Sequence, residues 1–421
     1  MENPRIATGR QAPKDLATFT ELSGFLNENH IKLIPREENN KENLINYHIE
    51  QNNGDDAFFI VDLGELLERY KQWVTLLPRI KPFCAVKACP DPMVLKTLAV
   101  LGCDFYCSSK TEIVQVTNID VPSNRILFVN PIKDPQHIKF ARSINVDLMT
   151  FDNEVELYKI KLYHPYAKLL VRIEVENSGY STKMSSKFGC PISEVRSLLE
   201  KARSLDLEVV GVTFYIGNKN SELEAFSKAI ENCKKVFEIA TALGMNMYYL
   251  NIGGGFPGGA SNSLLTFEDI ARTVNEAIDT HFANMEDLKI IAEPGRYFST
   301  KSHTLVFNVI GKRKGPEDLK NPSFEYYMND GIYGSFSCLI FDGVIPDISC
   351  LNNKPNDKKY KSTLYGPTCD NMDVITRSAE LPELGLGDWC FVENFGAYTQ
   401  VTSSEFGGFG MKENYYLFTY N

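Results

Sequence analysis

The sequence is short of positive charge and of long hydrophobic runs. Its 44 Lys and Arg residues are outnumbered by 54 Asp and Glu residues, which gives a net charge of −10. This balance argues against nucleic acid or an anionic membrane as a partner. No apolar run is long enough to span a bilayer, and the first residues lack the apolar segment of a signal peptide. We therefore expect a cytoplasmic protein.

Histidine is also scarce, with six residues, while ten cysteines are scattered along the chain. Cys84 and Cys89, like Cys103 and Cys107, do not have the spacing of a zinc pair and lack nearby histidines. We predict no metal site. Scattered cysteines in an acidic chain without a secretory signal are expected to be reduced thiols.

What the sequence does contain is a regular alternation of apolar strands with helices. Helix starts are indicated by Asp91-Pro92, by the capping pair Ser109 and Glu112, and by Asp134-Pro135. Strands that alternate with helices form parallel units, and eight of them suggest a closed (β/α)8 barrel of α/β class, with an open doubly wound sheet as the alternative. The predicted strands are 82–86, 103–107, 126–129, 146–151, 168–174, 209–216, 247–252 and 288–292.

The rest of the chain has a different pattern. Residues 1–24 are polar, and residues 31–60 contain short strand-like pieces. After residue 303 come strand-rich pieces with Gly and Pro turns, at 304–310, 324–328, 335–341, 389–392 and 415–420. We predict a polar N-terminal segment (1–24), a barrel (57–302) and a β domain made from 25–56 and 303–421.

A single lysine, Lys87, follows the first apolar strand of the barrel. In a barrel of this kind, catalytic residues lie at the carboxyl ends of the strands. A lysine buried near other charges can lose its proton and attack a carbonyl group. The alternative is a lysine whose stem packs along the strand while its ammonium reaches solvent.

Other strand ends carry Arg172, Tyr215, the glycines 253–255, and Glu293 with Arg296. Consecutive glycines leave backbone N–H groups uncovered for an anion, and an arginine suits a phosphate. A flexible turn and an internal salt bridge between Glu293 and Arg296 are the simpler alternatives. Together these side chains offer an amine, a phosphate cradle, a carboxylate and an aromatic face, which are what pyridoxal phosphate requires.

On these motifs the chain resembles the eukaryotic ornithine decarboxylase family. These are fold-type III pyridoxal-phosphate enzymes, which combine an alanine-racemase-like barrel with a β domain. The resemblance covers about residues 56–421, and its carriers are the segments 82–87, 107–112, 252–257, 292–297, 329–336, 365–370 and 396–399.

The resemblance implies that Lys87 forms the Schiff base and that Glu293 pairs with the pyridine nitrogen. It also implies a head-to-tail homodimer in which Cys369 of the partner subunit reprotonates the product. The further cofactor-binding residues that it implies are Tyr215, Asn218, Gly253, Gly254, Gly255, Pro294, Gly295, Arg296 and Tyr398.

The implied reaction is the conversion of ornithine to putrescine and CO₂ in polyamine biosynthesis. Phe341, Asp342 and, across the dimer, Asp370 are the implied substrate-binding residues. Two carboxylates at the far end of a substrate select a cationic side chain.

Several residues depart from the family pattern, and Ala88-Cys89-Pro90 after the lysine lacks the family's asparagine. Tyr106 replaces an aspartate near the lysine, Tyr215 replaces a histidine that stacks on the cofactor, and Asn218 and Lys219 replace serine and glycine. These changes leave two alternatives to ornithine decarboxylation. One is decarboxylation of another amino acid. The other is a weak or inactive paralogue that regulates polyamine synthesis by binding antizyme, as the family's antizyme inhibitors do.

Residues 130–160 match the family's antizyme-binding surface and include the cations Lys133 and Lys139. An ordinary solvated helix face is the alternative interpretation. The chain keeps Lys87, Arg296 and the pair Cys369-Asp370. Because antizyme inhibitors lose the pair or the arginine, this retention favours the enzyme.

Overall fold

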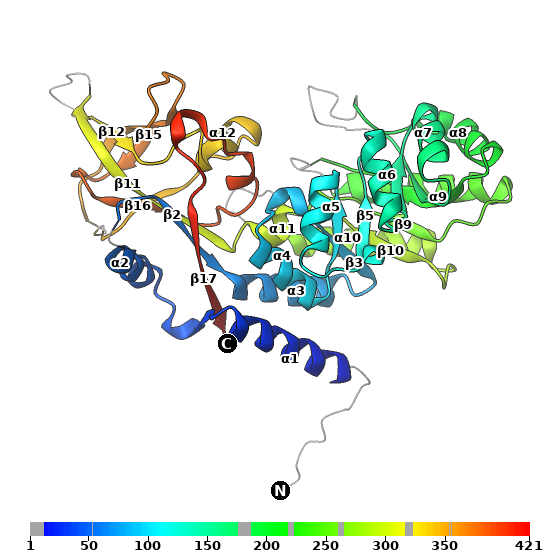
Figure 1. The fold of residues 1–421 in the computed structure, drawn as a ribbon, viewed down its shortest axis with the longest axis horizontal. Helices are drawn as coiled ribbons and strands as arrows, with labels where there is room; N and C mark the ends of the chain where they lie inside the picture. The colour runs from blue at the N-terminus through cyan, green and yellow to red at the C-terminus, as the bar shows by residue number, and fades with distance from the viewer. Residues whose placement is uncertain are drawn as a thin grey trace, which may run out of the picture.

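The computed structural model describes residues 12–52, 54–175, 187–217, 223–259, 265–315, 323–352, 354 and 356–421. Figure 1 shows two lobes, a barrel surrounded by helices and a β domain beside it. Helix α1 (Ala12–Glu28) lies below them and packs on α4 (Pro92–Leu101).

The first lobe is the predicted barrel. Its eight parallel strands close in the order β10-β3-β4-β5-β6-β7-β8-β9, so the closed barrel is confirmed and the open sheet is not. All eight strands lie at the predicted places, because continuous apolar runs suit strands that are covered on both faces. They are β3 (Ile80–Ala85), β4 (Asp104–Cys107), β5 (Ile126–Phe128), β6 (Leu148–Phe151), β7 (Lys168–Arg172), β8 (Glu208–Thr213), β9 (Tyr249–Asn251) and β10 (Lys289–Ala292).

The helices around the barrel begin where the sequence indicated. The Asp91 side chain accepts hydrogen bonds from the N–H groups of Met93 and Val94, at 2.9 and 3.0 Å, and α4 ends at Gly102 with a left-handed φ of 102°. The helices are α3 (Leu63–Leu76), α4, α5 (Lys110–Thr117), α6 (Pro135–Ser143), α7 (Glu154–Tyr163), α8 (Ile192–Ser204), α9 (Glu224–Ala242), α10 (Phe267–Phe282) and the short α11 (Arg296–Ser299).

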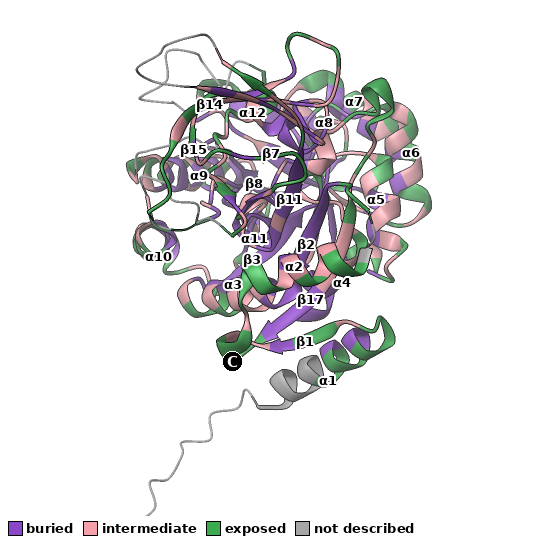
Figure 2. Cartoon of the chain, turned by 90° about the vertical axis from the view of Figure 1, so that its left-hand side faces the viewer, coloured by how far each residue is buried: buried purple, intermediate pink, exposed green. Residues whose placement is uncertain are grey.

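The second lobe is a nine-stranded sheet that the two ends of the chain build together. Strand β17 lies between β1 and β2, and the long β11 pairs with β2, β12 and β16. Figure 2 shows β2, the first half of β11 and the last part of β17 coloured as buried. The strands are β1 (Lys32–Pro35), β2 (Phe58–Asp62), β11 (His303–Lys314), β12 (Phe324–Met328), β13 (Ile348–Cys350), β14 (Tyr360–Tyr365), β15 (Val374–Leu381), β16 (Trp389–Val392) and β17 (Glu413–Tyr420).

Three details differ from the sequence-based prediction. Residues 12–24 of the expected polar segment are helical, and α2 (Lys41–Asn52) stands where strand-like pieces were expected. Strand β2 belongs to the nine-stranded sheet, although the boundary at residue 57 would assign it to the barrel.

The strand predicted at 335–341 is wrong. This segment forms a 3-10 turn, η5 (Ser335–Ser337), and the short helix α12 (Cys338–Phe341). The buried Asp330 carboxylate accepts hydrogen bonds from the N–H groups of Gly331 and Ser335, at 2.8 and 3.2 Å. A turn held by a side chain in this way satisfies the backbone without a neighbouring strand.

Lys133 is not a surface cation, contrary to the expectation for residues 130–160. Its ammonium is fully buried, 2.7 Å from Oε1 of the equally buried Glu156, and it donates to the carbonyl of Thr150 at 2.6 Å. Burial lowers the pKa of Lys133 to about 8. Lys139 is exposed, with its ammonium 4.7 Å from the ring centre of Tyr163.

Replacing Glu156 with alanine is expected to destabilise the protein by about 3–5 kcal/mol, because it leaves the Lys133 ammonium buried without its counter-charge. The midpoint of urea unfolding measures the loss. Glu154→Ala, which removes an exposed partner of Lys201 from the same helix, should change the midpoint little. Equal shifts of the unfolding midpoint in the two variants would show that the buried Lys133–Glu156 pair contributes no more to stability than the exposed pair.

Within the described ranges, no helix has the length and apolarity needed to cross a membrane. The same residues contain no cluster of His, Cys, Asp and Glu that could hold a metal ion. All ten cysteines are free thiols.

Candidate active site

A cavity of about 300 Å³ lies where the carboxyl ends of the barrel strands meet the β domain. It gathers residues from β3 and β4, from the segments that follow β3, β8, β9 and β10, and from the β domain. The lining residues are Ala85, Lys87, Tyr106, Tyr215, Gly254, Gly255, Phe256, Glu293, Gly295, Arg296, Phe341, Asp342, Tyr398 and Thr402.

Lys87 projects into this cavity from a 3-10 turn, η2 (Val86–Ala88), at the end of β3. Its Nζ lies 2.7 Å from the hydroxyl of Tyr106 on β4. Burial raises the pKa of the Tyr106 phenol, so this partner of the amine is uncharged at neutral pH. The residue that departs from the family pattern is therefore in direct contact with the predicted nucleophile.

Glu293 lines the same cavity just after β10. Its Oε1 accepts a hydrogen bond of 2.6 Å from Nδ2 of Asn251, a fully buried residue at the end of β9. Burial raises the pKa of Glu293, whereas the Asn251 hydrogen bond and the cations Arg172 and Lys87 lower it. The amide of Asn251 also accepts from the N–H of Gly253 at 3.0 Å, which ties the carboxylate to the glycine run.

The glycine run is a place where a side chain does not fit. Gly253 and Gly255 have φ values of 63° and 102°, which strain any other residue. A Cβ on Gly255 would lie 2.8 Å from the carbonyl oxygen of Gly217, and one on Gly254 would lie 2.9 Å from that of Glu293. Gly254 and Gly255 line the cavity, so their backbone is accessible to a ligand there, while Gly253 supports the turn from behind.

Arg296 begins α11 and is directed into the cavity. Its Nη2 lies 2.8 and 3.0 Å from the two carboxylate oxygens of Asp342, which follows α12. Its guanidinium also lies 5.0 Å from the ring centre of Tyr398. The predicted phosphate cation and the predicted substrate carboxylate are thus paired with each other.

Tyr398 is held in an unusual backbone conformation, with φ at 59°. Such a conformation persists in a non-glycine residue only when its surroundings fix it. Its N–H donates to the carbonyl of Ala88 at 2.9 Å, which places its ring beside the turn that carries Lys87. Burial raises the pKa of the Tyr398 phenol to about 12.

Tyr215 lines the cavity and is 38% exposed, with the guanidinium of Arg172 at 5.7 Å from its ring centre. Pro294 does not line it; its carbonyl accepts from the N–H of Ala85 at 3.0 Å and so joins β10 to β3. Asn218 and Lys219 lie outside the described residues.

Cys369 and Asp370 are not part of the cavity within one chain. The thiol of Cys369 is exposed, and the carboxylate of Asp370 accepts from the hydroxyl of Tyr333 at 2.7 Å and from the N–H of Met372 at 2.8 Å. Both were predicted to act across a dimer, so their place in one chain does not test that role.

Sequence reasoning did not assign Ala85, Asn251, Phe256 or Thr402 to the site. Asn251 could have been found as the polar residue before the glycines, since it ends a buried strand. Phe256 follows the glycines directly, but an apolar residue there gives no chemical signal. Thr402 comes from the β domain and becomes recognisable only when the two lobes meet.

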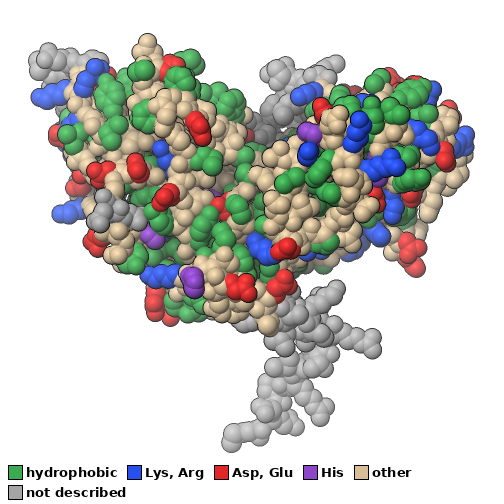
Figure 3. Space-filling view, in the orientation of Figure 1, with side chains coloured by type: hydrophobic (Ala, Val, Ile, Leu, Met, Phe, Trp, Pro, Cys, Tyr) green, Lys and Arg blue, Asp and Glu red, His purple; other side chains and the backbone are tan. Residues whose placement is uncertain are grey.

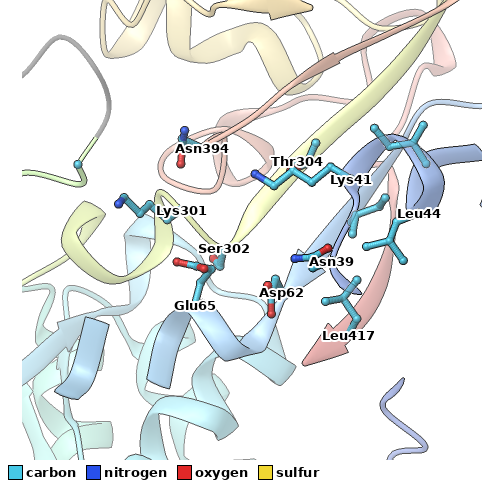
Figure 4. A pocket seen from close by; sticks show the side chains of 13 residues that line it. Asn39, Lys41, Leu44, Asp62, Glu65, Lys301, Ser302, Thr304, Asn394 and Leu417 are labelled. Atoms are coloured by element: carbon cyan, nitrogen blue, oxygen red, sulfur yellow. The ribbon is translucent and has the colours of Figure 1, made fainter. Parts of the chain in front are cut away.

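A second cavity of about 270 Å³ lies between α2, β2 and the turn at residues 301–304 (Figure 4). No predicted site residue lines it. Three of its charged side chains are engaged within the chain: Lys41 pairs with Glu393, Glu65 pairs with Arg36, and the Asp62 carboxylate accepts from the hydroxyl of Thr419 at 2.7 Å. We therefore place the chemistry in the first cavity.

Comparison with known proteins identifies the family. The sequence model "Pyridoxal-dependent decarboxylase, pyridoxal binding domain" matches residues 63–300. Antizyme inhibitor 2 of Xenopus laevis is 41% identical over 407 residues, covering 94% of this chain and 89% of that protein. The ornithine decarboxylase of Mus musculus is 41% identical over 372 residues, covering 86% of this chain and 80% of the enzyme.

Solved structures agree with this result. The arginine decarboxylase of Paramecium bursaria Chlorella virus has a TM-score of 0.84 and 35% identity, covering 89% of this chain and all of the enzyme. The lysine/ornithine decarboxylase of Vibrio vulnificus, solved with putrescine, has a TM-score of 0.81 and 29% identity, covering 91% and 99%. The chain therefore belongs to the pyridoxal-dependent decarboxylase family that includes the eukaryotic ornithine decarboxylases, as its sequence motifs predicted.

Proposed function

We propose that the protein is a pyridoxal-phosphate-dependent decarboxylase of a diamino acid, with ornithine as substrate and putrescine and CO₂ as products. One observation carries the proposal: a single cavity contains the amine of Lys87, the carboxylate of Glu293, the guanidinium of Arg296 and the carboxylate of Asp342. The ten free thiols fit a reducing compartment, and we place the activity in the cytoplasm.

The residues of the cavity fit the cofactor. The open glycine backbone and Arg296 suit a phosphate, while the buried Glu293 suits a protonated ring nitrogen. Pyridoxal phosphate, when bound through Lys87, supplies an acceptor for the electron pair left on the α-carbon as CO₂ departs.

The chain's own side chains then have separate tasks. Lys87 would provide the amine that holds the cofactor. Glu293, whose carboxylate accepts a hydrogen bond from Asn251, would pair with the protonated ring nitrogen. Tyr215 provides a flat aromatic face, and Asp342 receives the distal ammonium of the substrate. The thiol of Cys369 returns a proton to the α-carbon.

We propose that the active form is a homodimer, because Cys369 lies outside the cavity of its own chain. Large apolar side chains are exposed both at the rim of the cavity and beside Cys369. Phe341 and Ile345 are 71% and 78% exposed, and Met372 is 68% exposed. Exposed apolar groups of this kind mark surfaces that associate, and pairing these two surfaces brings the thiol of one chain to the cavity of the other.

The direct test is the visible spectrum of the purified protein with pyridoxal phosphate, followed by product assays with ornithine, lysine and arginine. We expect an absorption band that changes with the substrate, and putrescine as the main product. Cadaverine or agmatine as the main product would keep the enzyme class and change the substrate. Saturating cofactor without any band would reject the enzyme.

The affinity for pyridoxal phosphate is expected to fall at acid pH, when Glu293 becomes protonated; this fall is called the acid limb. Replacing Asn251 with alanine is expected to move the acid limb to higher pH. Burial already raises the pKa of Glu293, and the variant removes a hydrogen bond that lowers it. The carboxylate is therefore protonated at a higher pH, where it no longer pairs with a protonated ring nitrogen. Titration of pyridoxal phosphate binding against pH measures the shift.

Glu293→Gln serves as the reference for this titration, because it has no carboxylate to protonate and should lack the limb. Near-ultraviolet circular dichroism checks that Asn251→Ala keeps its tertiary packing. An unchanged acid limb in a folded Asn251→Ala would mean that another group sets it.

One observation favours antizyme binding as a second function. Helix α7 exposes Val155, Tyr158 and Leu162, by 69%, 48% and 68%, and Tyr166 beyond its end is 77% exposed. Val155, Tyr158 and Leu162 share one face of the helix. Figure 3 shows apolar and Lys or Arg side chains together on the surface where Figure 1 places α6 and α7. The similarity to antizyme inhibitor 2 extends over this region.

Capture of antizyme by the purified protein tests this function. We expect Leu162→Asp to weaken capture by placing a charge in the apolar face, while Glu194→Ala on α8 should not. Equal capture by the unmodified protein and Leu162→Asp would exclude this face as the contact.

A further inference from the structure

An ion pair connects Arg296, in the part of the proposed site for the cofactor phosphate, with Asp342, in the part for the substrate's distal ammonium. The carboxylate is fixed by the backbone around it: the N–H of Asp342 donates to the carbonyl of Cys338 at 3.0 Å, and Gly343 turns the chain with φ at 64°. The guanidinium is fixed at the start of α11, where the carbonyl of Arg296 accepts from the N–H of Thr300 at 3.0 Å. The side chains are only 20% and 10% exposed, so water screens the pair weakly.

Under the proposed function, each residue of the ion pair would also bind a ligand group. Arg296 would bind the phosphate of the cofactor, and Asp342 would bind the distal ammonium of the substrate. A phosphate beside Arg296 brings a dianion close to the carboxylate that already holds this cation, and like charges in a poorly screened site repel. The phosphate and the Asp342 carboxylate therefore compete for one guanidinium.

We propose that Asp342 is a gate on the phosphate subsite, and that this competition couples cofactor binding to diamine binding. In the free site, Asp342 neutralises Arg296. When a phosphate binds Arg296, the carboxylate loses its cation and becomes the receptor for an ammonium group. A bound diamine in turn withdraws the carboxylate from Arg296 and strengthens phosphate binding, because coupling between two ligands is reciprocal.

The inference rests on the proposed function in taking Arg296 as the phosphate ligand and Asp342 as the receptor for the distal ammonium. It concerns affinities, so it can be tested without turnover. The experiment compares pyridoxal phosphate with pyridoxal, which has the same aldehyde and ring but no phosphate. Both are titrated by absorbance into the full-length protein after removal of bound cofactor, using the unmodified protein, Asp342→Asn and Asp347→Asn.

We expect Asp342→Asn to bind pyridoxal phosphate at least about fivefold more tightly, a typical lower size for such coupling. Pyridoxal should bind equally to all three proteins. Asp347→Asn is the matched control, since it removes the same charge from an exposed position five residues along the same segment. It should leave both affinities unchanged.

A second titration adds putrescine. In the unmodified protein, putrescine should tighten the binding of pyridoxal phosphate, and in Asp342→Asn this effect should disappear. Asp342→Ser should behave like Asp342→Asn, which guards against an effect of one replacement on folding. The inference is overturned if Asp342→Asn and the unmodified protein bind pyridoxal phosphate with equal affinity. It is also overturned if Asp342→Asn gains as much affinity for pyridoxal as for pyridoxal phosphate.

These outcomes are separable from a failure of the proposed function. If no diamino acid is decarboxylated but the phosphate-specific gain is present, the gate stands and the enzymatic proposal falls. If ornithine is decarboxylated and the phosphate-specific gain in affinity is absent, the enzymatic proposal stands and the gate is rejected.

Discussion

Replacing Lys87 with alanine is expected to abolish the visible absorption band of the cofactor and to lower decarboxylation at least about a thousandfold, as losses of covalent catalysts do. Lys87 is the lysine that lines the cavity, and its amine faces Glu293, Arg296 and the hydroxyl of Tyr106. Without that amine the cofactor has no covalent link to the chain. Absorbance titration and release of CO₂ from labelled ornithine measure the two effects.

Two further variants are the controls for Lys87→Ala. Lys87→Arg keeps the positive charge but not the nucleophile, and should be as inactive as the alanine variant. Lys81→Ala removes a half-exposed lysine from the same strand and should keep both the band and the activity. A Lys87→Ala protein with an unchanged band would place the covalent link elsewhere.

Replacing Cys369 with alanine is expected to lower putrescine formation by about 10²- to 10⁴-fold, the usual contribution of a general acid. The cofactor band should remain, because Cys369 lies outside the cavity that holds Lys87. Loss of product with an intact band would separate proton return from cofactor binding.

Mixing the two inactive variants then tests whether the site is shared. Lys87→Ala and Cys369→Ala chains that exchange partners should regain about a quarter of the normal activity, since half of the random dimers are mixed and each has one intact site. If Cys369 served its own chain, no mixed dimer would contain a complete site. No recovery in a sample with proven exchange would therefore contradict the shared site.

The barrel and the residues at its strand ends could be predicted from the sequence, because each leaves a local signal. Residues 82–86, which run from β3 into the following turn, are a continuous apolar stretch, and Asp91-Pro92 after it is a helix start whose cap the structure contains. Once eight such units are recognised, the fold itself gathers Lys87, the glycines and Arg296 at one end.

The remaining features depend on contacts between distant segments. The burial of Lys133 follows from the approach of α7, which carries Glu156, and nothing near residue 133 indicates it. The turn at 335–341 depends on the carboxylate of Asp330, while its apolar residues resemble a strand. The pairing of Arg296 with Asp342 joins residues 46 positions apart, in different lobes.

The position of β17 in the sheet has a consequence for the order in which the protein folds during synthesis. The barrel closes when β10 pairs with β3, and all its strands are made by residue 292. The other lobe cannot be completed then, because β1 and β2 have β17 between them, and β17 is made only at residues 413–420. Its contacts are among the longest in the chain, and such contacts form slowly.

The edges of β1 and β2 that face β17 therefore stay unpaired until residues 413–420 have been made. Unpaired strand edges are sites of misassociation, which makes the second lobe the vulnerable part of a nascent chain. Asp62 links the two stages, since its side chain caps α3 and later binds the N–H and hydroxyl of Thr419 on β17. The cavity, which needs Asp342 and Tyr398, can therefore be assembled only after all the barrel strands have been made.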